Sequence, residues 1–102
     1  MKVGITPFQV GEIVEVLMGR ESGKHMIVLD VQERFVLLAD GDKRKYDQAK
    51  KKNVRHIRST GHIAQNVVES IAENGRISNA KLRFILQDYL SNYMIRDEEK
   101  GE

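Results

Sequence analysis

The first half of the chain alternates apolar and polar positions with a period of two, which is typical of half-buried β-strands. In the first such segment Val10, Val14, Val16 and Met18 share one face, and Glu12 breaks the pattern. Tight polar turns separate the segments. The predicted strands are 9–18, 24–31, 34–39, 43–46 and 54–57. Five short strands joined by tight turns indicate a small β-barrel.

The fourth strand is predicted to return through a hairpin at Asp40-Gly41, because Gly accepts the positive φ of a two-residue turn. After residue 58 the apolar spacing changes to three and four, the period of amphipathic helices. Ser59 or Thr60 is the predicted cap of a first helix, which Asn74-Gly75 ends. Ser78 or Asn79 is the predicted cap of a second.

These patterns predict an α+β protein in three parts. A five-stranded barrel is expected at 1–58, a two-helix hairpin packed on it at 59–96, and a solvated tail at 97–102. With 40% hydrophobic residues in 102, the chain can build a modest core. It has no cysteine, which excludes disulfides and thiolate zinc sites. The longest apolar run, Phe35–Ala39, is too short to span a bilayer, and no signal peptide is visible, so we expect a cytoplasmic protein.

Positive charge is concentrated in one stretch, residues 42–58, which we call the basic ribbon. It carries eight Lys and Arg against two Asp, whereas the rest of the chain has nine basic residues against thirteen acidic ones. The formal net charge of +2 therefore hides a polarised molecule. Such a ribbon is most simply explained by a polyanionic partner, with nucleic acid as the leading candidate.

Several segments together resemble a known family. The run 10–16, followed by Gly19-Arg20 and Gly23-Lys24, resembles the KOW motif of ribosomal proteins and NusG-type transcription factors. The segment 35–41 with its basic continuation, and Asn79–Arg83 in the last helix, extend the likeness to bacterial KOW-domain RNA-binding proteins. These are kin to the small KOW-containing large-subunit ribosomal proteins of archaea and eukaryotes. The resemblance implies an SH3-like barrel, RNA binding, a role with the ribosome in translation, and no catalysis.

The turn around Gly23 contains Glu21 and Ser22 and has fewer lysines than the family's commoner K-D-K-G-K form. We therefore expect the ribbon to carry most of the electrostatics. The partner favoured is RNA, with rRNA or the ribosome first and contact with a ribosomal protein as a further option. The residues predicted to hold backbone phosphates are Arg20, Lys24, Lys43, Arg44, Lys45, Lys50, Lys51, Lys52, Arg55 and Arg58.

Further cations lie near the start of the second helix. Arg76, Lys81 and Arg83 surround a helix N-terminus, where backbone amides attract anions. They could form a second phosphate site, although the alternative that they point into water is favoured.

Aromatic residues have two interpretations as well. Phe35 and Tyr46 could stack on unpaired bases, and core packing is the favoured alternative. Tyr89 and Tyr93, one turn apart, are expected to seal the helices against the barrel.

Catalysis has little support in the sequence. His25, His56 and His62 show no metal-ligand spacing, and no nucleophile elbow or Gly-rich phosphate loop is present. We predict no catalytic residue, metal, cofactor, small-molecule substrate or membrane contact.

Two other functions stay open. The half after Arg58, with five basic and seven acidic residues, could recruit a basic ribosomal or transcription-complex protein, which makes a protein-interaction module the main alternative. Binding to DNA is the third option. The sequence does not favour it, because the ribbon lies outside the helices that would enter a groove of the DNA.

Overall fold

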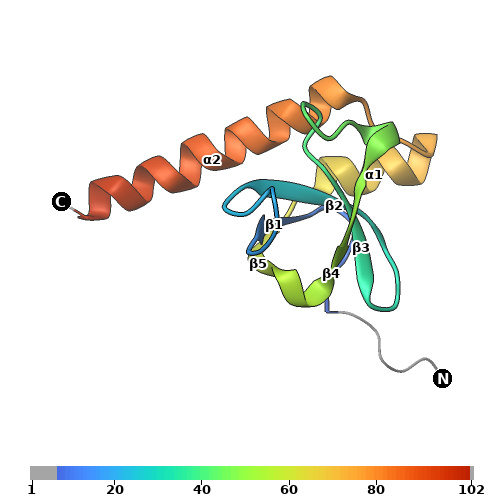
Figure 1. Cartoon of the computed structure of the whole chain (residues 1–102). Helices are drawn as coiled ribbons and strands as arrows, with labels where there is room; N and C mark the ends of the chain where they lie inside the picture. Colours follow the sequence, from blue (N-terminus) through green and yellow to red (C-terminus); the bar gives the residue numbers. More distant parts are fainter. Residues whose placement is uncertain (1–6, 102) are drawn as a thin grey trace.

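The protein is described here from a computed structural model, which covers residues 7–101, with side chains from 7 to 93. Five antiparallel strands form one sheet in the order β4-β3-β2-β1-β5. The elements are β1 (Glu12–Val16), β2 (His25–Val31), β3 (Phe35–Ala39), the 3₁₀ turn η1 (Tyr46–Gln48), β4 (Lys50–Asn53), the 3₁₀ turn η2 (Val54–His56), β5 (Ile57–Ile63), α1 (Gln65–Asn74) and α2 (Asn79–Gly101) (Figure 1). The predicted α+β class is confirmed.

The sheet carries apolar side chains on both faces. One face forms a core of buried residues from the strands themselves: Val14, Val16, Met26, Val28, Val36, Leu38 and Ile57. The opposite face, with Ile13, Ile27 and Ala39, packs against residues of the helices such as Val67 and Leu82. Because both faces are covered, consecutive residues of β1 and β2 are buried. The period-two pattern therefore identified the strands but placed Ile13 on the solvent side and Met18, which is 55% exposed, on the buried side.

The expected closure into a barrel is not observed. β4 and β5 are the two edges of the sheet, and no ladder joins them in the described part of the chain. The two strands are instead connected by the short turn η2, which has 3₁₀ geometry. The Lys52 side chain of β4 reaches Gly19 of the β1–β2 turn, since a Cβ placed on Gly19 would lie 2.6 Å from the Lys52 Nζ atom.

The fourth strand was predicted at 43–46, which is wrong, since β4 lies at Lys50–Asn53. The backbone of residues 40–46 is engaged elsewhere. Asp40 Oδ1 accepts bonds from the N–H groups of Asp42 and Arg44, both at 2.9 Å. The N–H of Tyr46 donates to Asn79 Oδ1 of α2 at 2.7 Å. The polar groups that would have paired with β3 thus hold a loop against the second helix.

The fifth strand and the first helix both begin later than predicted. Residues 54–56 form η2, and β5 extends through Ser59 and Thr60, which therefore do not cap α1. Thr60 Oγ1 donates to the carbonyl of Ile13 at 2.7 Å, and the Ser59 hydroxyl donates to the buried Glu12 carboxylate. These bonds across the β1–β5 ladder explain why both hydroxyl residues belong to the strand.

The predicted end of α1 and the predicted start of α2 are confirmed. Gly75, with φ of 79°, ends α1, and its N–H donates to Ile71 O. Ser78 Oγ accepts a bond from the N–H of Lys81 at 3.1 Å, so Ser78 caps α2. The backbone of α2 continues to Gly101. Side chains from residue 94 onward, and with them the predicted solvated tail, lie outside the described residues.

Candidate nucleic-acid interface

Three basic side chains that are distant in sequence line one hollow of about 370 Å³. Lys24 comes from the β1–β2 turn directly before β2, Lys43 from the β3–β4 loop and Arg83 from the second turn of α2. Asp40 and Asp42 also line the hollow. We call this hollow the basic groove. It brings together two predicted phosphate contacts, Lys24 and Lys43, with Arg83, for which solvent was the favoured environment.

The loop that carries Lys43 is held firmly in place. Arg83 donates from Nη1 to the carbonyl of Gly41 at 2.7 Å, which ties the loop to α2. The Asp40 carboxylate lies in the groove, but its Oδ1 already accepts the two loop N–H bonds described above. Gly41 itself is buried, with φ of +80°. Lys43 is exposed on this ordered support, so it can meet an anion at little further cost in conformational entropy.

A second hollow, of about 380 Å³, lies at the other end of β3 and β4. It is lined by Arg34, Asn53, Val54 and Arg55. Asn53 Oδ1 accepts from the N–H of Arg55 at 2.8 Å and fixes the turn. Arg34 was not among the predicted residues, because only the pairing of Phe35 with Asn53 brings it beside Arg55.

Other ribbon residues are engaged in bonds within the protein. Arg44 Nε lies 3.5 Å from Glu21 Oε2, so Glu21 of the β1–β2 turn partly offsets the charge of the ribbon. Lys45 donates from Nζ to the carbonyl of Asp42 at 2.8 Å. Arg20 is exposed in the same turn as Glu21 and does not line the basic groove.

Arg58 forms the tightest ion pair of the ribbon. Its Nη2 donates to Glu15 Oε1 at 2.6 Å across the β1–β5 ladder. This hydrogen bond, together with the guanidinium charge, holds the pKa of Glu15 below its usual value of 4.5. A phosphate that binds Arg58 must compete with this carboxylate.

The three consecutive lysines of β4 do not act alike. Lys52 lies opposite Val36 and is only 8% exposed, so it offers a phosphate far less surface than the predicted contact requires. Strand alternation puts Lys50, half-buried opposite Leu38, on the same face. Lys51 points the other way and is exposed, with Nζ 4.7 Å from the Phe35 ring centroid. Of the three, Lys51 is the one most open to a ligand.

Tyr46 packs within the protein. Its hydroxyl donates to the carbonyl of Gly75 at 3.0 Å, and the Arg76 guanidinium lies 4.9 Å from its ring centroid. Arg76 also lies 3.5 Å from Asp47. These contacts are the ones expected if Tyr46 packs within the protein, which was the alternative favoured over stacking on a base.

Metal binding and membrane insertion find no support among the described residues. In the part of the chain with described side chains, no group of three His, Asp or Glu is placed to hold a metal ion. Within the same limits, neither helix combines the length and the apolar character that a membrane span requires.

Comparison with known proteins gives a significant match. The chain is 43% identical over 44 residues to the protein named "Putative ribosome-binding protein YbzG" from Bacillus subtilis (strain 168). The match covers 43% of this chain, and the chain spans 60% of the length of that relative. No protein-family model matches the chain, so its likeness to KOW proteins stays a resemblance.

Proposed function

We propose that this protein binds structured RNA of the ribosome through backbone phosphates held in the basic groove. The observation that carries the proposal is the meeting of Lys24, Lys43 and Arg83, from three separate elements, around one hollow. Basic side chains scattered at random over a surface would not be expected to meet around one hollow in this way. The relative named as ribosome-binding supports the choice of the ribosome as the source of the RNA.

The proposal assigns the other exposed cations a lesser role. Arg34, Lys51 and Arg55 lie on or beside β3 and β4 and could meet a second stretch of the same RNA. Arg44 and Arg58 are paired with Glu21 and Glu15, so we expect them to contribute less than their charge alone would indicate. Contacts of this kind fix position and read little sequence, so selectivity would come from the shape of the RNA. The protein would act in the cytoplasm during translation and carry out no catalysis.

The test is a titration of rRNA fragments at several salt concentrations with single neutralised variants. Each lost phosphate contact lowers the slope of log affinity against log salt by about 0.7–0.9. We expect this loss for Lys43→Gln. The matched control is Lys81→Gln, which removes the same charge from an exposed residue of α2 that does not line the groove. Equal slopes for the two variants would contradict the proposal.

A second measurement addresses the ribosome itself. In sucrose gradients of a native lysate, the protein is expected to sediment with ribosomal particles at low salt and to leave them at high salt. Lys43→Gln should lower the salt concentration at which release occurs, whereas Lys81→Gln should not.

A further inference from the structure

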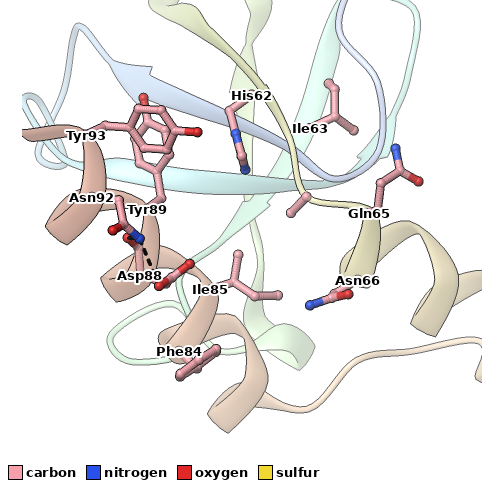
Figure 2. Close-up of a pocket in the computed structure, with 11 residues that line it drawn as sticks. His62, Ile63, Gln65, Asn66, Phe84, Ile85, Asp88, Tyr89, Asn92 and Tyr93 are labelled. Atoms are coloured by element: carbon pink, nitrogen blue, oxygen red, sulfur yellow. Dashed lines mark hydrogen bonds between the residues drawn. The ribbon is translucent and has the colours of Figure 1, made fainter.

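A different hollow, of about 440 Å³, lies between α2 and the junction of β5 with α1 (Figure 2). One wall of it is aromatic. The rings of Tyr89 and Tyr93 stack with centroids 4.7 Å apart and planes at 27°, and the His62 ring lies 5.2 Å and 5.6 Å from them. Tyr93 is 41% exposed, so part of this aromatic surface is open to a ligand. We call it the aromatic hollow.

The polar groups of the aromatic hollow are acceptors and amides. Asp88 and Asn92 contribute from α2, with Gln65 and Asn66 from the start of α1. Asn92 Nδ2 donates to Asp88 Oδ1 at 3.0 Å and to the Asp88 carbonyl at 2.9 Å, which fixes the carboxylate beside the tyrosines. Among the described side chains, which end at residue 93, no Lys or Arg lines the hollow.

The second helix therefore separates two hollows of opposite character. Arg83 and Gln87 face the basic groove, whereas Asp88 and Asn92 face the aromatic hollow. A phosphate in the aromatic hollow would be repelled by Asp88, and no Lys or Arg among the described lining residues offsets that charge. A guanidinium is suited to both parts of the site, because it stacks on tyrosine faces and forms charge-assisted bonds with a carboxylate.

The remaining groups suit a peptide. The side-chain amides of Gln65 and Asn66 can both donate and accept, as peptide backbone requires. At the rim Phe84 is 65% exposed and offers an apolar contact to the residue next along a bound chain. The site thus combines an aromatic wall, one fixed carboxylate and backbone-compatible amides.

We propose that the aromatic hollow binds an arginine side chain from a basic segment of a partner protein. The Arg would stack on Tyr93 and donate to Asp88, with its neighbours in the segment bonded to Asn66. This inference goes beyond RNA binding and uses none of the residues assigned to phosphate. It gives the chain a second interface, on the opposite side of α2 from the basic groove.

The test uses the full chain and blocked hexapeptides of alternating Gly with Arg, Lys or Glu, followed by the ring signals of Tyr89 and Tyr93 in NMR. The Arg peptide is expected to bind tightest, the Lys peptide more weakly and the Glu peptide not at all. Asp88→Asn should weaken binding of the Arg peptide by about tenfold or more, the loss typical for a charge-assisted bond. The matched control, Glu33→Gln, removes a carboxylate from an exposed residue outside the hollow and should leave the affinity unchanged.

Two results would overturn the inference. One is equal loss of peptide affinity in Asp88→Asn and Glu33→Gln, which would indicate nonspecific charge attraction. The other is stronger binding of adenosine monophosphate than of the Arg peptide at the same ring signals, which would assign the hollow to a nucleotide. RNA affinity measured on Asp88→Asn keeps this test separate from the first proposal. We expect the RNA affinity of Asp88→Asn to equal that of wild type. If RNA binding fails for all variants while the peptide result holds, only the proposal of RNA binding falls.

Discussion

Replacing Gly41 by Ala tests whether the β3–β4 loop packs against α2 as described. A Cβ on Gly41 would overlap the carbonyl oxygen of Asn79 and lie 2.9 Å from Leu82 Cβ. The backbone at Gly41 also has φ of +80°, where an L-residue costs about 1–2 kcal/mol. Overpacking against well-packed atoms adds about 1–3 kcal/mol. The substitution should therefore destabilise the protein through two separate causes.

The matched control is Gly23→Ala in the β1–β2 turn. Gly23 has a similar φ of +89°, but a Cβ added there would have nothing within 4 Å. Both variants gain about 0.4–1 kcal/mol from the lower entropy of the unfolded chain. Their difference thus isolates the packing cost, about 1–3 kcal/mol in the free energy of unfolding.

Urea unfolding followed by circular dichroism measures this difference. In thermal unfolding it corresponds to about 4–8 °C for each kcal/mol. Gly41→Ala should also weaken RNA binding beyond Gly23→Ala, because displacement of the loop moves Lys43 away from Arg83. Equal stability losses in the two variants would refute the reasoning, since they would mean that the loop does not rest on α2.

Two further predictions concern the charges of the sheet. Lys52→Met keeps the buried stem of the side chain, so we expect the free energy of unfolding to change by less than about 1.5 kcal/mol. The RNA affinity of this variant should be unaffected. Lys51→Met, in contrast, should lower the salt slope of RNA binding by about 0.7–0.9. A salt slope that falls in Lys52→Met as much as in Lys51→Met would contradict the burial of Lys52. The Glu15–Arg58 pair predicts that stability depends on pH. The folded pKa of Glu15 lies below 4.5, so the stabilisation that the pair gives the folded state is fully present above pH 4.5 and is lost as the pH falls below that value. Urea unfolding should show wild type more stable than Glu15→Gln at pH 7, and the gap should close as the pH falls through the folded pKa of Glu15. A gap that does not change with pH would contradict the lowered pKa.

The sequence alone predicted the α+β class and the first three strands because those properties follow from local periodicity. It also predicted the end of α1 at Gly75 and the start of α2 at Ser78, where a local signal exists. It failed where a distant contact decides the local structure. The strand predicted at 43–46 rested on the hairpin signal at Asp40-Gly41, but Asn79 takes the N–H of Tyr46. The chain pairs with β3 only later, through three lysines that have little preference for strands.

The candidate site could be predicted only as a set of residues. Charge counting selected Lys43, Lys51 and Lys52 equally, since nothing in a run of lysines states which of them face solvent. The register of β4 against β3 decides this, and it buries Lys52 and exposes Lys51. Arg83 was given a lesser place because its side chain, near the start of α2, was expected to point into water. Its bond to the carbonyl of Gly41 instead holds it beside the loop that carries Lys43.

The position of α2 is therefore the main determinant of what the basic residues can do. The sheet by itself presents Lys24 at one strand end and leaves residues 40–46 without strand partners. Asn79 and Arg83 of α2 supply those partners, through Tyr46 N–H and the carbonyl of Gly41. The same helix places Asp88 and Tyr93 on its other side. Since one rigid element builds both hollows, a ligand that shifts α2 at one of them alters the geometry of the other, and binding at the two sites should be coupled.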